Sequence, residues 1–206
     1  KLNNKKINLI NVDFKFKKTF DKISDKSNVY INECFVTALN LLKKKNCAGI
    51  INGPISKKNF LKEKHLGITE YLGHKTKNKT IMLIYNKKIS VHPITTHLPL
   101  KKVSKSLSKK KIINNIKLIK EFYKNNFNKN PKIAVTGLNP HCESNYKSSE
   151  EDKFIRPAIT SLIKSKYKVS GPYAADTVFL KENLKKFDVV VGMYHDQVLT
   201  PIKTLF

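Results

Sequence analysis

The first third of the chain shows a helical pattern followed by a short apolar run. Residues 29–45 carry apolar side chains at close to helical spacing and end in a run of lysines, which suits a helix C-terminus. Residues 47–51 are largely apolar and are stopped by the turn-forming Asn-Gly-Pro at residues 52–54. The pattern therefore predicts a helix, then a strand, then a loop.

Two β-rich runs come next along the chain. Residues 80–85 and 89–94 are separated by a short polar Asn-Lys-Lys segment, which predicts a hairpin or two adjacent strands. Pro93 has no backbone N–H to donate, so it favours an edge strand or a strand end.

Strands and helices alternate again in the second half. Residues 112–127 have the pattern of an amphipathic helix that ends before Pro131, and residues 132–137 form a strand-like run. Residues 188–194 are a continuous β-branched run, typical of a strand buried on both faces. Strands that alternate with helices imply a mostly parallel sheet, so the expected fold class is α/β.

The segment between these strands carries helix-start and turn signals. Ser148 and Glu151 have capping-box spacing ahead of a helix that extends to about Lys164, and Pro157 predicts a kink or a later start. Residues 171–177 form a turn-rich segment in which Asp176 is either a helix N-cap or an active-site carboxylate.

The composition raises the question of a nucleic-acid partner. The 206-residue chain has a formal net charge of +26, and lysine-rich surfaces attract phosphate backbones. Arg156 is the only arginine, however, and the lysines are spread along the whole chain. Nucleic-acid recognition usually relies on arginine for bidentate contacts. We therefore expect a solvated basic surface and no nucleic-acid partner.

The cysteines and the apolar runs indicate the cellular compartment. Cys34, Cys47 and Cys142 are odd in number and lack CxxC spacing, which argues against a disulfide framework or a zinc ribbon. No apolar run is long enough for a membrane span, and the lysine-rich start lacks the pattern of a secretory signal. A cytoplasmic protein without membrane contact is expected.

Three of the six histidines follow strand-like runs. His97, His141 and His195 each lie just past such a run, and ligands bind beyond the carboxyl ends of strands in open α/β sheets. Three imidazoles suit a divalent metal with an open position, which Asp196 or Asp176 could support. Each histidine could equally be a hydrogen-bonded loop residue. Residues 53–57 similarly allow either a phosphate-binding loop or a structural turn.

Several short motifs occur in one order along the chain. They are GP at residues 53–54, GITEY at 67–71, TTHLPL at 95–100, GLNPH at 137–141, GPYAADT at 171–177 and MYHDQ at 193–197. In this order and spacing they resemble the 4-hydroxythreonine-4-phosphate dehydrogenase family of vitamin B6 biosynthesis. The resemblance extends from about residue 28 to residue 206.

The resemblance implies an isocitrate/isopropylmalate-dehydrogenase-like α/β/α fold with two domains flanking a cleft. Residues 1–66 would be the remainder of the first α/β domain, and residues 67–206 the second domain, which binds metal and substrate. The family also implies a homodimer whose metal site takes histidines from both subunits. Because family segments would precede Lys1 and follow Phe206, we expect an internal fragment.

The resemblance also assigns residues to roles. His97, His141 and His195 match the metal ligands, for zinc, cobalt, magnesium or manganese. Asp176 and Lys203 match catalytic positions; Thr69 and Lys203 match substrate contacts, with Lys203 directed to the phosphate. The NAD-binding residues are expected in the segments beyond the two ends.

There are two departures from the family pattern. The family's substrate-binding histidine is replaced by Ile68, and the glycine-rich stretch after the Asn-Pro-His motif is shortened at residues 142–144. Selectivity for the substrate is therefore open.

The implied reaction is NAD-dependent oxidation of 4-phosphohydroxy-L-threonine at C3, with decarboxylation to 3-amino-2-oxopropyl phosphate. One alternative is a dehydrogenase for threonate or erythronate 4-phosphate, which the departure at Ile68 motivates. Another is a truncated, non-catalytic metal-binding remnant.

Overall fold

The computed structural model describes residues 5–20, 22–62, 64–142 and 148–206. The chain divides into two compact units, residues 1–80 and residues 81–206, and each is described by itself. The boundary predicted after residue 66 separates two domains of the longer family fold, which differ from these two compact units, and it stays a prediction. The shortened stretch at residues 142–144 lies mostly outside the described residues.

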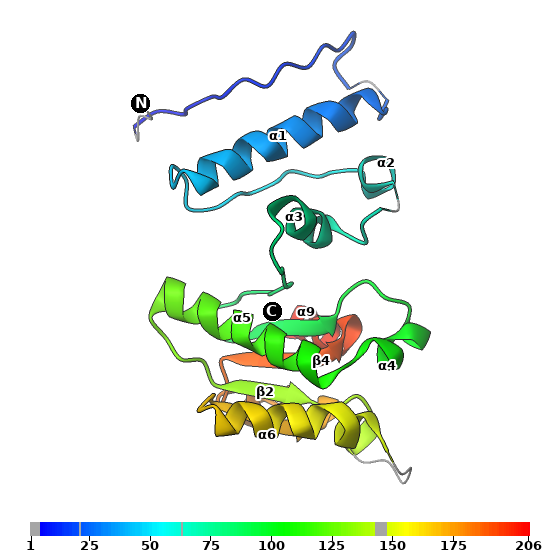
Figure 1. Ribbon diagram of the computed structural model, residues 1–206, viewed down its shortest axis with the longest axis vertical. Coiled ribbons are helices and arrows are strands. Elements are labelled where there is room, and N and C mark those ends of the chain that lie inside the picture. Colours follow the sequence, from blue (N-terminus) through cyan, green and yellow to red (C-terminus); the bar gives the residue numbers. More distant parts are fainter. Residues whose placement is uncertain (1–4, 21, 63, 143–147) are drawn as a thin grey trace. The chain divides into compact units, whose positions relative to one another are not determined.

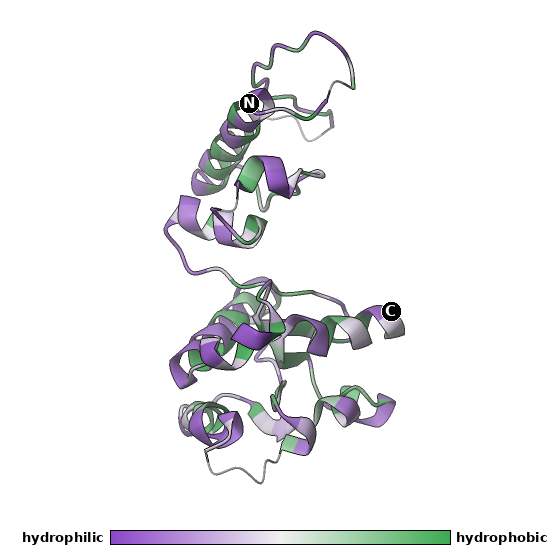
Figure 2. Ribbon diagram, turned by 90° about the vertical axis from the view of Figure 1, so that its right-hand side faces the viewer, coloured by the Kyte–Doolittle hydropathy of each residue, from purple (hydrophilic) through white to green (hydrophobic). Residues whose placement is uncertain are grey.

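The first unit is built from helices around a small aromatic cluster. Its helices are α1 (Lys26–Lys43), α2 (Lys57–Leu61) and α3 (Ile68–Thr76). Phe35, Leu61 and Tyr71 are buried together, with the Phe35 and Tyr71 ring centroids 5.2 Å apart. The predicted helix over residues 29–45 is confirmed as α1, whose hydrophobic and hydrophilic positions alternate along the ribbon (Figure 2).

The strand predicted over residues 47–51 is wrong. These residues are not in a strand, and Ile51 is 101% exposed. An isolated strand gains little in water because its backbone groups need a partner strand. No strand is present among the described residues of this unit to supply one.

The second unit contains a four-stranded parallel sheet. Its strands are β1 (Ser90–Thr95), β2 (Ile133–Thr136), β3 (Val169–Tyr173) and β4 (Val189–Tyr194), in the order β1-β4-β2-β3. Each neighbouring pair is parallel. The expected α/β class is therefore confirmed.

Helices cover both faces of this sheet. Val189, Val191 and Met193 belong to a core shared with α5 (Lys109–Phe127) and α6 (Arg156–Lys164). Val190 points to the other face, into a core shared with α7 (Ala175–Val178) and α9 (His195–Leu205). Figure 1 shows α5 and α6 in front of the strands and α9 behind them. This is a three-layer α/β/α arrangement.

Short helical segments complete the unit. They are η1 (Leu100–Lys102), α4 (Val103–Ser106), η2 (Pro140–Cys142), η3 (Glu151–Ile155) and α8 (Lys181–Leu184). None of the helices among the described residues is both long and apolar enough to cross a lipid bilayer.

Most of the patterns in this unit predicted the correct element. The helix over 112–127 and the strands over 89–94, 132–137 and 188–194 are confirmed, and β1, which carries Pro93, is an edge strand. The run at 80–85 forms only one antiparallel bridge, between Ile84 and Val91.

Strand β3 was not expected, because its Gly171-Pro172 sequence indicates a turn. Gly171 adopts φ +132°, and an added Cβ would lie 2.3 Å from the Val135 carbonyl oxygen. Only glycine allows both this backbone conformation and this close approach to β2. The glycine therefore permits an edge strand where the sequence pattern favours a turn.

We expect Gly171→Ala to lower the free energy of unfolding of the second unit by at least about 2 kcal/mol, because alanine adds strain and a steric clash. Urea denaturation followed by circular dichroism measures this. Gly49→Ala is the control, since an added Cβ there meets nothing within 4 Å. Equal effects of the two substitutions would contradict the interpretation.

The buried His92 makes stability depend on pH. Its Nδ1 lies 2.7 Å from the Met82 carbonyl oxygen and its Nε2 lies 3.0 Å from the Asn115 amide nitrogen, so the ring is neutral with its proton on Nδ1. Burial lowers the pKa of His92 from 6.5 to about 4, against the opposing effect of the Met82 carbonyl.

Between about pH 6.5 and pH 4 the unfolded chain therefore binds the extra proton and the folded chain does not. We expect this difference to remove about 3 kcal/mol of stability as the pH falls through that window, with no further loss below it. Urea midpoints at pH 7 and pH 4.5 measure the effect. Most of the dependence should disappear in His92→Gln, where only the smaller contribution of the carboxylates remains, and all of it should persist in His74→Gln, whose histidine is exposed.

Candidate active site at the carboxyl edge of the sheet

The four parallel strands bring the candidate residues to one edge of the sheet. The segments after β1, β2, β3 and β4 carry His97, His141, Asp176 and His195, respectively. Because the strands run in the same direction, their carboxyl ends lie at the same edge, where ligands bind in open α/β folds.

His97 and His195 lie next to each other at this edge. They follow the adjacent strands β1 and β4, and their ring centroids are 5.8 Å apart with an interplanar angle of 41°. Two imidazoles that bind one tetrahedral ion through bonds of about 2.0–2.1 Å have centroids roughly 5 Å apart. The two rings are therefore slightly further apart than two imidazole ligands of one divalent metal.

Asp196 orients the ring of His195. The Nδ1 atom of His195 lies 2.6 Å from the Asp196 carboxylate oxygen Oδ1. A carboxylate accepts the Nδ1 proton, which leaves the Nε2 lone pair available to a metal. The carboxylate support proposed from the sequence is therefore present for one of the three histidines.

His141 follows β2 in the short helix η2 and is exposed. Its backbone is left-handed, with φ 56° and ψ 10°. Within the described ranges, no group of three or more His, Cys, Asp or Glu side chains is arranged to hold a metal. The structure thus brings two of the three predicted ligands, His97 and His195, together. His141 as the third ligand stays a prediction, and so does a site shared between two subunits.

The buried amide of Gln197 ties the strand ends beneath this site. Its Oε1 accepts hydrogen bonds from the Met193 N–H at 2.7 Å and the Thr136 hydroxyl at 2.8 Å, and its Nε2 donates to the Gly137 carbonyl at 2.8 Å. Thr95 Oγ1 donates to the Met193 carbonyl at 2.7 Å. The ends of β1, β2 and β4 are thereby fixed together. The sequence places Gln197 in a motif but indicates no role for it.

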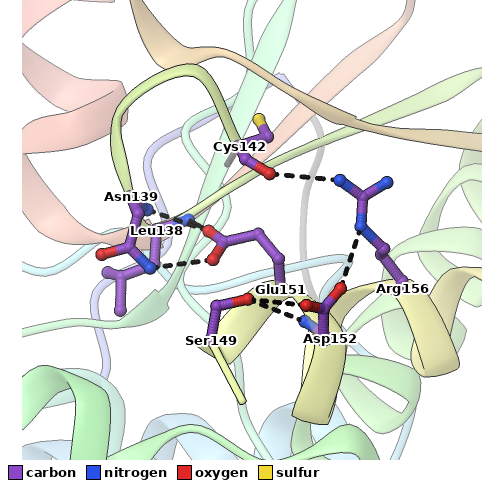
Figure 3. Close-up of polar contacts among 7 residues, drawn as sticks. All are labelled: Leu138, Asn139, Cys142, Ser149, Glu151, Asp152 and Arg156. Atoms are coloured by element: carbon purple, nitrogen blue, oxygen red, sulfur yellow. Dashed lines mark hydrogen bonds and ion pairs between the residues drawn. The ribbon is translucent and has the colours of Figure 1, made fainter. Parts of the chain in front are cut away.

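The carboxylate of Glu151 binds the loop that carries His141 (Figure 3). Oε1 accepts from the backbone N–H groups of Leu138 at 2.7 Å and Asn139 at 2.9 Å, and Oε2 accepts from the Asn139 amide at 2.8 Å. Burial raises the pKa of Glu151, but the hydrogen bonds from Asn139 and Leu138 outweigh this effect and hold the pKa below its usual value. The group is therefore an anion at neutral pH.

The predicted capping box at Ser148 and Glu151 is wrong by one residue. Ser149 Oγ, instead, accepts from the Asp152 N–H at 3.3 Å. The α-helix itself starts at Arg156, after the π-helical turn η3, so Pro157 marks the later start. Glu151 is thus free to bond a distant loop instead of its own helix end.

The remaining predicted residues belong to three different helices. Asp176 is exposed in the first turn of α7, whose N-cap is Ala174, so the N-cap alternative is wrong. Lys203 is exposed on α9, eight residues after His195, which is about 12 Å along a helix axis. Thr69 lies in the first unit, half-buried on α3.

Two sequence features of the first unit have structural explanations. Ile68 packs against the cluster of Phe35, Leu61 and Tyr71, so the isoleucine serves the apolar core there. Residues 53–57 lead into α2, a helix of only five residues whose N-cap, Ser56, makes no side-chain cap bond. No observation favours a phosphate at this loop over a structural turn.

Comparison with known proteins identifies relatives of the whole chain. The model of the family described as pyridoxal phosphate biosynthetic protein PdxA matches residues 1–206. A 4-hydroxythreonine-4-phosphate dehydrogenase of Sulfurihydrogenibium sp. is 36% identical over 204 residues, covering 97% of this chain and 62% of the relative.

Two further matches add a second substrate name and a solved structure. A protein of Oceanobacillus iheyensis, named as a candidate D-threonate 4-phosphate dehydrogenase, is 35% identical in a match that spans 82% of this chain and 52% of the relative. The crystal structure of 4-hydroxythreonine-4-phosphate dehydrogenase from Klebsiella pneumoniae has a TM-score of 0.81 at 31% identity, covering 89% of this chain and 58% of that one. The chain thus spans about half to three-fifths of the length of these relatives.

Truncation of Gln197 tests the network under the site. Gln197→Ala leaves two buried donors and one buried acceptor without partners, so we expect the free energy of unfolding to fall by about 2–4 kcal/mol. Urea denaturation measures it, with Thr200→Ala, exposed on the same helix, as the control. A fall in the free energy of unfolding of less than about 1 kcal/mol, typical of an ordinary surface substitution, would refute this role of Gln197.

Proposed function

The chain belongs to the PdxA family of pyridoxal phosphate biosynthetic proteins, and on that premise we propose that it is part of an NAD-dependent 4-hydroxythreonine-4-phosphate dehydrogenase. The substrate is 4-phosphohydroxy-L-threonine. The C3 carbon loses a hydride to NAD and its hydroxyl group loses a proton to the enzyme or solvent, which yields NADH and a β-keto acid. The β-keto acid then loses CO2 and takes up a proton, which leaves 3-amino-2-oxopropyl phosphate.

The observation that carries this proposal is the His97–His195 pair at the carboxyl edge of the sheet, with His195 oriented by Asp196. Imidazole nitrogens suit zinc or cobalt better than manganese or magnesium. With His141 as third ligand, these residues would hold the ion. A divalent cation at this place supplies Lewis acidity toward the oxygen at C3.

The other candidate residues serve the substrate. Asp176 follows β3 at the same edge, and its carboxylate would take up or return the proton of the reacting hydroxyl. The Lys203 ammonium, further along α9, is a charge partner for the substrate phosphate. Thr69 on α3 is a third substrate contact by motif position. A homodimer that shares the site, NAD-binding residues beyond this chain and a cytoplasmic location stay predictions.

A second candidate substrate is D-threonate 4-phosphate. The relative from Oceanobacillus iheyensis carries that name, and Ile68 replaces a substrate-binding histidine of the family. Threonate bears a hydroxyl where the threonine derivative bears an amine, so the loss of one polar contact can change the preference between the two.

The test is NADH formation by the complete protein with each substrate and added cobalt or zinc. We expect turnover with 4-phosphohydroxy-L-threonine, and a fall in kcat/KM of at least about 100-fold in His195→Ala, since the loss of one metal ligand removes several kcal/mol of transition-state stabilisation. His74→Ala, which changes an exposed histidine of the first unit, is the matched control.

The comparison of substrates decides between the candidates. A higher kcat/KM for threonate 4-phosphate would transfer the assignment to that substrate. Absence of turnover with both substrates and every metal would favour a non-catalytic remnant.

A further inference from the structure

We infer that Glu151 is a positioning residue, whose buried carboxylate fixes the loop of residues 138–142 and so presents His141 at the carboxyl edge of the sheet. The inference rests on the proposed function, since the role of His141 as a ligand belongs to it. Glu151 itself touches neither substrate nor metal.

The Glu151 carboxylate is well suited to bind the N–H donors of this loop. The residue is 1% exposed, and its two oxygens accept from three N–H donors that belong to only two residues, Leu138 and Asn139. An ionised carboxylate only accepts hydrogen bonds, so it satisfies converging donors without a conflict. Bonds to a charged acceptor are also roughly twice as strong as neutral ones.

Glu151 is not needed to start its own helix. Ser149 Oγ already accepts from the Asp152 N–H at the beginning of η3. All the hydrogen bonds of the Glu151 side chain reach a loop more than ten residues earlier in the chain. Its role is therefore a long-range one.

His141 lies between two anchored points. The loop is bound at Leu138 and Asn139 by Glu151, and at Cys142, whose carbonyl accepts from Arg156 Nη2 at 3.1 Å (Figure 3). His141 and Cys142 both have positive φ, 56° and 58°. Two consecutive non-glycine residues in this region cost roughly 1–3 kcal/mol each, and persist only where the surroundings enforce them. The anchors on either side of His141 supply that enforcement.

Glu150, the residue before Glu151, connects the same loop to α4, which follows His97 in the chain. Glu150 accepts from the hydroxyl of Ser104, on α4, and from the Asn139 amide at 3.0 Å. Burial opposes the charged form of Glu150, but the bonds from Ser104 and Asn139 are stronger and hold its pKa below the usual value. Two adjacent carboxylates thus connect the segments that follow β1 and β2, each of which carries a predicted ligand.

The test is Glu151→Gln in the complete protein without substrate. The variant keeps the shape but replaces one acceptor oxygen with an NH2 group that must face a donor of Leu138 or Asn139. We expect cobalt binding, measured by equilibrium dialysis with the metal alone, to weaken at least about 10-fold. Amide hydrogen exchange at Leu138 and Asn139 should accelerate at least about 10-fold.

Two further variants keep the result interpretable. Glu121→Gln makes the same substitution at an exposed position of α5 and should change neither readout. Should Glu151→Gln fail to fold, Asn139→Asp provides a second test, because it sets a new carboxylate against Glu150 and Glu151 while leaving the helices intact. It should give the same losses.

Unchanged cobalt affinity in the folded variant would overturn the inference, and so would unchanged exchange at Leu138 and Asn139. If the parent protein binds no divalent metal, the proposed function fails. In that case the link from the loop to a metal site is also refuted, but the amide exchange rates at Leu138 and Asn139 still show whether Glu151 fixes the loop.

Discussion

The parallel direction of the four strands is the constraint on which the rest of the second unit depends. A parallel strand cannot return through a tight hairpin, so each connection crosses the sheet and covers one of its faces. This requirement places the connecting helices α5 and α6 on one face and α7 on the other. It also sends every connection out from the same edge, where His97 and His195 meet.

Rigid buried polar groups and exposed reactive groups are separated at this edge. Gln197, Glu151 and Thr95 are buried and fully engaged in hydrogen bonds, whereas His97 and Asp176 are exposed. Buried polar groups that are fully satisfied rigidify a structure, because any rearrangement leaves one of them without a partner in a medium of low dielectric constant. The buried set thus holds backbone positions and leaves the exposed side chains available to ligands.

Local periodicity predicted the elements of the second unit well because its helices and strands bury clear apolar faces. It failed where a contact distant in sequence decides the outcome. Residues 47–51 have strand-like composition but no partner strand, and β3 exists because Gly171 can approach Val135 closely. Neither fact is visible in a short window of sequence.

The same division applies to the site. The approach of His97 to His195 follows from strand-end reasoning once the sheet is parallel, although the sequence could not show that β1 and β4 are neighbours. Glu151 stands out in the sequence only through the spacing of a capping box, a local pattern, whereas its partners lie on another loop. Gln197 gives no periodic signal because its role depends on hydrogen bonds that join the ends of two strands, β2 and β4.

The contact between Arg156 and the Cys142 carbonyl has a consequence for anion recognition. The chain has a single guanidinium group, and that group is engaged with a backbone carbonyl and with Asp152. A phosphate bound away from Arg156 therefore meets ammonium groups, which attract charge from any direction and impose no planar, two-point geometry. The angular precision of phosphate binding must come from hydroxyl groups and backbone amides, so lysine substitutions should change affinity more than orientation.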